Sequence, residues 1–122
     1  MSPRSEELLD AARGRLAGAE AALADDPSTA VSAAYYSMLY AARAALSERE
    51  VYARTHRGTW HEFRRVFVEA GEFDGDLAAA VRRVQPEREQ VDYEAWSPPP
   101  VEARRAIELA QAFLRAIEEV LG

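Results

Sequence analysis

Apolar residues recur three or four positions apart along most of this chain, which is the spacing that places them on one face of an α-helix. A first helix is predicted from about Ser5 to Ala24. Asp26 followed by Pro27 is typical of a helix start, so a second helix is predicted from there to about Arg49. The most regular repeat predicts a last helix near the C-terminus and comprises Ala103, Ile107, Ala110, Leu114, Ile117 and Leu121.

Two further helices are predicted in the middle of the chain. The third covers about Thr59 to Ala70, and the fourth begins after a capping residue at Asp74. Pro86 falls inside the fourth helix and is expected to kink it. The segment SPPP, residues 97–100, is expected to form a stiff turn. Because no β-type alternation appears, the pattern predicts an all-α fold, a five-helix up-down antiparallel bundle in a single domain, residues 1–122.

The second helix carries two stripes of large side chains instead of one. Tyr35 and Met38 lie on the first stripe, and Tyr36, Tyr40 and Arg43 form a second stripe about 100° further round the helix. Such a helix is either central in its own bundle, with tyrosine hydroxyls bonded locally, or shared between two molecules. In the second case this second stripe lies at the interface of a homodimer, where amphipathic aromatic side chains are favoured. The pattern leaves both arrangements open.

The charge of the chain bears on its partners. The 122 residues carry a net charge of −6, so nucleic-acid binding would require a local basic patch. The most basic segment is residues 49–65, which contains five arginines and both histidines. This segment is either a solvated face or a surface for RNA phosphates, a nucleotide or an acidic partner protein. Arg54, His56 and Arg57 are therefore candidate ligand-binding residues.

Composition also limits the cofactors and the location that are expected. The chain has no cysteine, which excludes disulfides and thiolate-bound metals. His56 and His61 lack a nearby set of carboxylates, so no metal site and no other cofactor are predicted. No signal-peptide segment is found at the N-terminus, and no apolar run approaches the ~20 residues of a membrane span. A cytoplasmic protein without membrane association is therefore predicted.

Three segments resemble motifs of the HEPN domain family, and they occur in the same order. They are AVSAAYYSMLYAARAAL (residues 30–46), ARTHRGTWHEF (residues 53–63) and REQVDY (residues 88–93). The resemblance implies a helical bundle that dimerises, with a cleft between protomers built around Arg88, Asp92 and Tyr93. Many members of the family are ribonuclease toxins that are held in check by a nucleotidyltransferase encoded beside them.

The ribonuclease members of the family share a catalytic arginine followed, after four to six residues, by a histidine. The arginine stabilises the charge that develops on the phosphoryl group, and the histidine moves the 2′-hydroxyl proton. With Arg88 as the arginine, the histidine positions hold Tyr93, Glu94 and Ala95, so no RNA cleavage is expected. The alternative catalytic pair is Arg88 with His56, brought to the cleft by folding. In some relatives a tyrosine after the histidine is adenylylated, which makes Tyr93 a candidate acceptor.

Arg88 falls on the apolar stripe of the fourth helix, where an arginine must be paired or lie at a cleft. Asp92 follows one helical turn later and is within reach of it. One interpretation is a structural ion pair between Arg88 and Asp92, with Tyr93 packed over it as a lid. The other is an anion-binding arginine at the dimer cleft.

Three functions are compatible with these residues. The first is a binding module, the helical half of a nucleotidyltransferase–HEPN pair. It would recognise a nucleotide, RNA or its partner protein through Arg88, Asp92, Tyr93, His56, Arg57 and Arg54. The second is a metal-independent ribonuclease toxin with His56 as a non-standard base. The third is a purely structural interaction protein.

Overall fold

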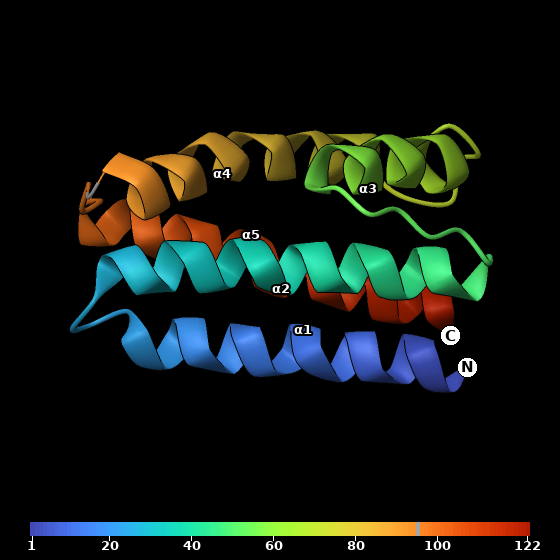
Figure 1. Cartoon of the computed structure of the whole chain (residues 1–122), viewed down its shortest axis with the longest axis horizontal. Coiled ribbons are helices and arrows are strands. Elements are labelled where there is room, and N and C mark those ends of the chain that lie inside the picture. The colour runs from blue at the N-terminus through green and yellow to red at the C-terminus, as the bar shows by residue number, and fades with distance from the viewer. Residues whose placement is uncertain (95) are drawn as a thin grey trace.

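The structure is a computed structural model that describes residues 1–94 and 96–122. Five α-helices and one short π-helix occur in this part of the chain: α1 (Pro3–Ala22), α2 (Pro27–Glu48), α3 (His56–Phe63), η1 (Arg64–Val68), α4 (Gly75–Glu94) and α5 (Pro100–Leu121). The four long helices alternate in direction, and the short α3 lies beside the first half of α4 (Figure 1). The prediction of an all-α, five-helix antiparallel bundle is confirmed. None of the helices in the described ranges combines the length and apolar character needed to cross a bilayer.

α3 begins earlier than the sequence pattern predicted. The predicted start was Thr59, whereas the helix begins at His56. Thr55 caps it, because its Oγ1 accepts the N–H of Gly58 at 2.9 Å. A Cβ atom on residue 58 would lie 2.8 Å from this oxygen, so glycine is the residue that fits the cap. As a consequence His56, a candidate site residue, occupies the first turn of α3.

The remainder of the predicted third helix is a π-helix, η1. Its backbone hydrogen bonds join residues five apart, as between the N–H of Glu69 and the carbonyl of Arg64 at 2.9 Å. Phe67, within η1, is 1% exposed and stays in the core. The wider turn thus keeps its phenylalanine buried while Arg64 remains exposed beside α4.

α4 contains Pro86, as the sequence pattern predicted, and extends beyond it to Glu94. Arg88 and Asp92 therefore lie on one uninterrupted helix, one turn apart. Arg88 faces the bundle and is 5% exposed, whereas Tyr93 is 78% exposed. On this one helix, Arg88 is therefore buried in the bundle and Tyr93 is exposed to solvent.

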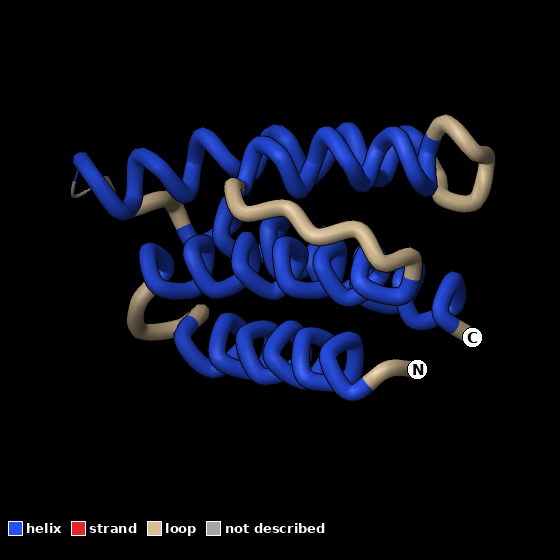
Figure 2. Tube along the Cα trace, turned by 45° about the vertical axis from the view of Figure 1, so that its right-hand side comes forward, coloured by secondary structure: helices blue, strands red, loops and turns tan. Residues whose placement is uncertain are grey.

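α2 is the central helix of the bundle and packs against α1, α4 and α5 (Figure 2). Six of its alanines are fully buried, which lets the neighbouring backbones approach closely. Under α3, the core is filled by aromatic rings whose centres lie 5.0–6.3 Å apart: Trp60, Phe63, Phe67, Phe73 and Phe113. The two stripes of large side chains on α2 allowed either a central helix or a helix shared between two molecules. Within this single chain, α2 is the central helix.

Candidate functional site

Arg88 is the charged residue at the centre of the candidate site. Its side chain points into the bundle and is 6% exposed. The guanidinium carbon lies 5.0 Å from the ring centre of Tyr35 and 5.8 Å from that of Tyr36, both on α2. These aromatic faces attract a cation and compensate in part for its loss of water. The arginine is therefore held by α2 as well as by its own helix.

Both terminal nitrogens of Arg88 have polar partners within the protein. Nη1 donates to Oδ2 of Asp92 at 3.3 Å, and Nη2 lies 3.3 Å from Nδ1 of His56. Glu89 adds a longer charge contact, with Oε1 4.0 Å from Nη2. Of the three guanidinium nitrogens, Nε alone lacks a hydrogen-bond partner among the described residues. The helical ion pair predicted from the spacing of Arg88 and Asp92 is present in the structure.

The contact with Arg88 fixes the protonation of His56. A guanidinium donates hydrogen bonds and accepts none, so Nδ1 of His56 must accept and the ring proton must be on Nε2. Burial of the ring, followed by the positive charges of Arg88 and Arg43, lowers the pKa of His56, and Glu89 opposes this in part. His56 is therefore a neutral imidazole at neutral pH.

Arg88 keeps its charge in this environment. Burial by itself lowers the pKa of Arg88, but the hydrogen bond with Asp92 and the nearby tyrosines outweigh burial, so the pKa lies above its ordinary value. The cluster thus combines a permanent cation, a carboxylate and a neutral histidine. Asp92 and His56 supply polar partners for Arg88, which is buried and would be costly without them.

Further polar contacts hold α3 against α2 next to this cluster. Arg43 Nε donates to Thr59 Oγ1 at 3.1 Å, and Trp60 Nε1 donates to the hydroxyl of Tyr35 at 3.2 Å. Because His56 begins the same helix, these contacts fix the position of its ring relative to Arg88. The candidate site is therefore assembled by α2, α3 and α4 together.

The cluster is chemically closed in this arrangement. Arg88 is 6% exposed and each of its terminal nitrogens already has one partner inside the protein, so the guanidinium is directed inward instead of toward a phosphate in solvent. A general base needs a free lone pair, and the one on His56 Nδ1 already accepts from Arg88. Within the described ranges, no three histidine, aspartate or glutamate side chains converge to hold a metal ion. The geometry matches a structural arginine better than a catalytic one.

The other predicted ligand residues lie at the surface of the protein. Arg54 and Arg57 are exposed and line a surface hollow of about 770 Å³ formed by α3 and the segment before it. Tyr93 is 78% exposed and does not pack as the lid that the sequence suggested. Ala95, one of the positions where a histidine would complete the ribonuclease signature, lies outside the described residues.

The tyrosines assigned to a dimer interface are partly buried within the single chain. Arg15 of α1 covers Tyr36 and Tyr40, with its guanidinium carbon 5.5 Å and 5.7 Å from their ring centres. Arg43, from the same stripe, is bonded to Thr59 of α3. Contacts with α1 and α3 therefore occupy part of this stripe, and its role in a homodimer stays a prediction.

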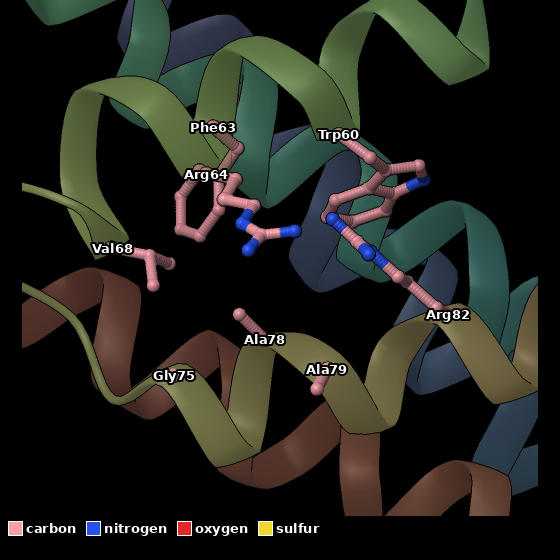
Figure 3. Close-up of a pocket in the computed structure, with 8 residues that line it drawn as sticks. All are labelled: Trp60, Phe63, Arg64, Val68, Gly75, Ala78, Ala79 and Arg82. Atoms are coloured by element: carbon pink, nitrogen blue, oxygen red, sulfur yellow. The ribbon is translucent and has the colours of Figure 1, made fainter.

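Sequence reasoning missed one feature of the surface, a hollow between α3–η1 and α4. Its volume is about 240 Å³, and its lining consists of apolar positions and two arginines: Trp60, Phe63, Arg64, Val68, Gly75, Ala78, Ala79 and Arg82 (Figure 3). The spacing of Trp60 to Arg64 and of Ala78 to Arg82 puts each pair on one helix face and was visible in the sequence. The approach of the two helices was not, because it depends on tertiary contacts.

Comparison with known proteins places the chain in a family. A family model described as the HEPN domain matches residues 5–120. A stretch of 66 residues is 33% identical to the Methanocaldococcus jannaschii protein named "Putative toxin MJ0142", and it covers 54% of this chain and 45% of that protein. The chain thus matches less than half the length of this relative. Because the family model extends over almost the whole sequence, the chain belongs to the HEPN domain family.

Proposed function

We propose that this chain is the helical half of a nucleotidyltransferase–HEPN pair of the toxin–antitoxin type, and that it binds a nucleotide or RNA without cleaving it. Family membership supports the proposal, as does the relative whose name contains the word toxin. The observation that carries it is the closed cluster around Arg88, whose terminal nitrogens already pair with Asp92 and His56. An arginine held in this way supports the fold and leaves phosphate recognition to other residues.

The contacts of His56 and the chemistry of Tyr93 support binding without cleavage. Metal-independent RNA hydrolysis needs a group that takes the 2′-hydroxyl proton near neutral pH. His56 carries its proton on Nε2, and its Nδ1 lone pair faces Arg88. The signature position held by Tyr93 offers a phenol, and phenols are poor bases at neutral pH. None of these groups is poised to start the reaction.

A cleavage assay tests the proposal directly. Purified protein is expected to leave single-stranded RNA and tRNA intact relative to a heat-inactivated sample, while a gel-shift assay with the same RNA or a nucleotide titration detects binding. The product of a neighbouring nucleotidyltransferase gene is expected to co-purify with the chain. RNA cleavage by the purified protein would contradict the non-cleaving role.

A ribonuclease with an unusual base is the second candidate, and one distance favours it. His56 Nδ1 lies 3.3 Å from Arg88 Nη2, so folding brings together the two residue types that the reaction uses. In this mechanism a bound phosphate draws Arg88 away from the histidine, which frees Nδ1 to act as base. Cleavage that survives EDTA and disappears in both Arg88→Ala and His56→Ala would establish this candidate in place of the first.

The proposed protein acts as a homodimer, with the stripe of Tyr36, Tyr40 and Arg43 near the interface. The two tyrosines are only partly buried within one chain, so a second copy could cover the remainder. Sedimentation equilibrium at micromolar concentration is expected to give twice the chain mass of 13.6 kDa. A monomer under these conditions would reject the interface.

Tyr93 is the proposed acceptor of a nucleotidyl group from the partner enzyme. It is 78% exposed, so an enzyme could reach its hydroxyl without unfolding α4. Co-expression with the nucleotidyltransferase is expected to add the mass of a nucleoside monophosphate to the chain. The addition should disappear in Tyr93→Phe and persist in Tyr52→Phe, because Tyr52 is also exposed and serves as the matched control.

A further inference from the structure

The hollow between α3–η1 and α4 combines an apolar wall with positive charge. Trp60 and Phe63 form one side, and Ala78 and Ala79 form the other. Figure 3 shows the side chains of Arg64 and Arg82 extending into the space between the two helices. Small residues on α4 leave this space open, since Ala79 is itself exposed. A flat or compact apolar group would fit against these walls beside the two guanidinium groups.

The two arginines of this hollow have no acidic partner in the described part of the chain. No carboxylate described there lies within 4.0 Å of Arg64 or Arg82, and none lines the hollow. Like charges that face one open space repel each other, and an anion placed between them removes that repulsion. The lining of the hollow is therefore positively charged, without a carboxylate to balance it among the described residues.

A second hollow on α4 provides the contrast. It lies between α4 and α5, has a volume of about 330 Å³, and contains two arginines, Arg83 and Arg105. Glu87 and Glu102 also line it, so its charges balance by count, although neither carboxylate lies within 4.0 Å of an arginine among the described residues. Burial, followed by the nearby charge of Glu102, raises the pKa of Glu87. The hollow beside α5 therefore contains as many carboxylates as arginines, unlike the hollow between α3–η1 and α4.

The hollow on the α3 side adjoins a larger and more polar one. The second space has a volume of about 630 Å³, shares Trp60 and Arg82 with the first, and adds Arg57 and His61. Glu89 is the carboxylate of this lining, and it already lies 4.0 Å from Arg88. The two hollows, called the joined hollows below because they share Trp60 and Arg82, include one of about 630 Å³, which is within the range of small-molecule sites, about 300–1,000 Å³. They offer an apolar compartment at one end and several cations at the other.

We propose that these joined hollows bind a phosphorylated small molecule that carries a flat ring. The ring rests against Trp60 and Phe63, and the phosphate lies between Arg64 and Arg82, within reach of Arg57. Phosphate fits better than a single carboxylate, because a phosphate monoester carries up to two negative charges and can accept from several guanidinium groups at once. This inference rests on the proposed binding function and places the ligand between α3–η1 and α4, at residues other than Arg88.

Tryptophan fluorescence gives a local measurement of binding. The chain has two tryptophans, so Trp96→Phe leaves Trp60, in the wall of the hollow, as the single reporter. Adenosine monophosphate is expected to cause a saturable fluorescence change. Adenosine and inorganic phosphate, which each lack one half of the ligand, are expected to bind about tenfold more weakly or worse.

Paired variants separate the hollow from general positive charge. In the Trp96→Phe background, Arg64→Gln with Arg82→Gln is expected to weaken binding of adenosine monophosphate by about tenfold or more. Arg83→Gln with Arg105→Gln removes the same charge from the balanced hollow and is expected to leave binding unchanged. Ala79→Leu, which fills the apolar compartment without changing charge, is expected to weaken the ring-bearing ligand while the melting temperature holds.

The phosphate could belong to a free nucleotide or to the end of an RNA, and binding of the two kinds of ligand is compared to decide between them. Tighter binding of a short 5′-phosphorylated RNA than of its 5′-hydroxyl form assigns the site to an RNA end, and tighter binding of the mononucleotide assigns it to a free nucleotide. Lack of saturable binding by any phosphorylated ligand at millimolar concentration, or equal loss in both arginine pairs, overturns the inference. The proposed function is tested separately by running the same RNA on a gel. Cleaved RNA would contradict the non-cleaving role, whereas the site of ligand binding is judged from the fluorescence titrations alone.

Discussion

Arg82 and Arg88 lie on the same helix, yet their surroundings differ completely. Arg88 is 5% exposed, and two tyrosine rings, Asp92 and His56 surround it. Arg82 is exposed beside a second arginine, without a carboxylate within 4.0 Å among the described residues. The charge that looks most functional in the sequence is thus satisfied inside the protein. Arg82, whose charge remains available to a ligand, lies outside the motifs identified in the sequence.

The comparison separates two uses of arginine. A buried guanidinium must donate its hydrogen bonds to partners inside the protein, since an unpaired buried charge is costly. An exposed guanidinium beside an apolar surface keeps its donors and can bind an external anion. Burial and pairing, more than position in a motif, therefore assign the role of each arginine on α4.

Removal of Arg88 is expected to have the largest effect on stability. Arg88→Ala leaves Asp92 and His56 without their shared partner and opens space between Tyr35 and Tyr36. We expect a loss of about 2 kcal/mol in the free energy of unfolding, below the value for a fully buried pair because Asp92 keeps 28% exposure. Urea denaturation measures it. A loss equal to that of Arg82→Ala would break the comparison between the two arginines.

Removal of the acidic partner is expected to have a smaller effect. Asp92→Asn keeps the shape of the side chain and one acceptor oxygen, so Arg88 loses charge neutralisation but retains a hydrogen bond. A loss of about 1 kcal/mol is expected in the same denaturation experiment. In a double-mutant cycle with Arg88→Ala, the two losses should not add, because both remove one interaction. Additive losses would show that the carboxylate acts independently of Arg88.

Acid is expected to weaken the same cluster through His56. The folded-state pKa of His56 lies below its unfolded value of about 6.5, so the unfolded chain takes up the proton more readily. The stability that the neutral ring contributes is therefore complete above about pH 6.5, and it is lost as the pH falls through the folded pKa. The charged groups that face the ring are Arg88, Arg43 and Glu89.

Two histidine variants isolate this dependence. His56→Gln supplies an amide oxygen that can accept from Arg88 and does not titrate, so the loss of stability between pH 7 and pH 5 should become smaller. His61→Gln, at the exposed histidine of the same helix, is the control and should leave the loss as in the wild type. Denaturation at the two pH values measures both. An unchanged loss in His56→Gln would show that the ring is not held neutral by its neighbours.

The sequence predicted the helices well and the site only in part. The three-four repeats fixed the all-α bundle, and the spacing of Arg88 and Asp92 predicted their ion pair because both lie on one helix. His56 meets Arg88 across 32 positions of sequence, which depends on how α3 packs on α2 and was available only as an alternative. The start of α3 was missed because Thr55 was not recognised as its cap.

The hollow beside α4 could not be predicted for a related reason. Its lining comes from α3, η1 and α4, and the π-helix follows no pattern that hydrophobic periodicity detects. The sequence did show that residues 49–65 are basic, and Arg57 and Arg64 of the joined hollows come from that segment. Their pairing with Arg82 needed the folded arrangement.

The smallest effect on stability is expected at the open arginine pair. Arg64→Gln with Arg82→Gln removes two exposed charges that repel each other, so the free energy of unfolding should change by less than about 0.5 kcal/mol and can even rise. The change should be more favourable at low salt, because screening weakens the repulsion that the variant removes. Denaturation at two salt concentrations measures it, with Arg83→Gln and Arg105→Gln as the matched pair. That control removes two arginines that line their hollow with glutamates, and it should destabilise slightly at low salt. If both double variants changed the free energy of unfolding in the same direction, the two hollows would not differ in charge balance. The contrast between the arginines of the two hollows would then be wrong.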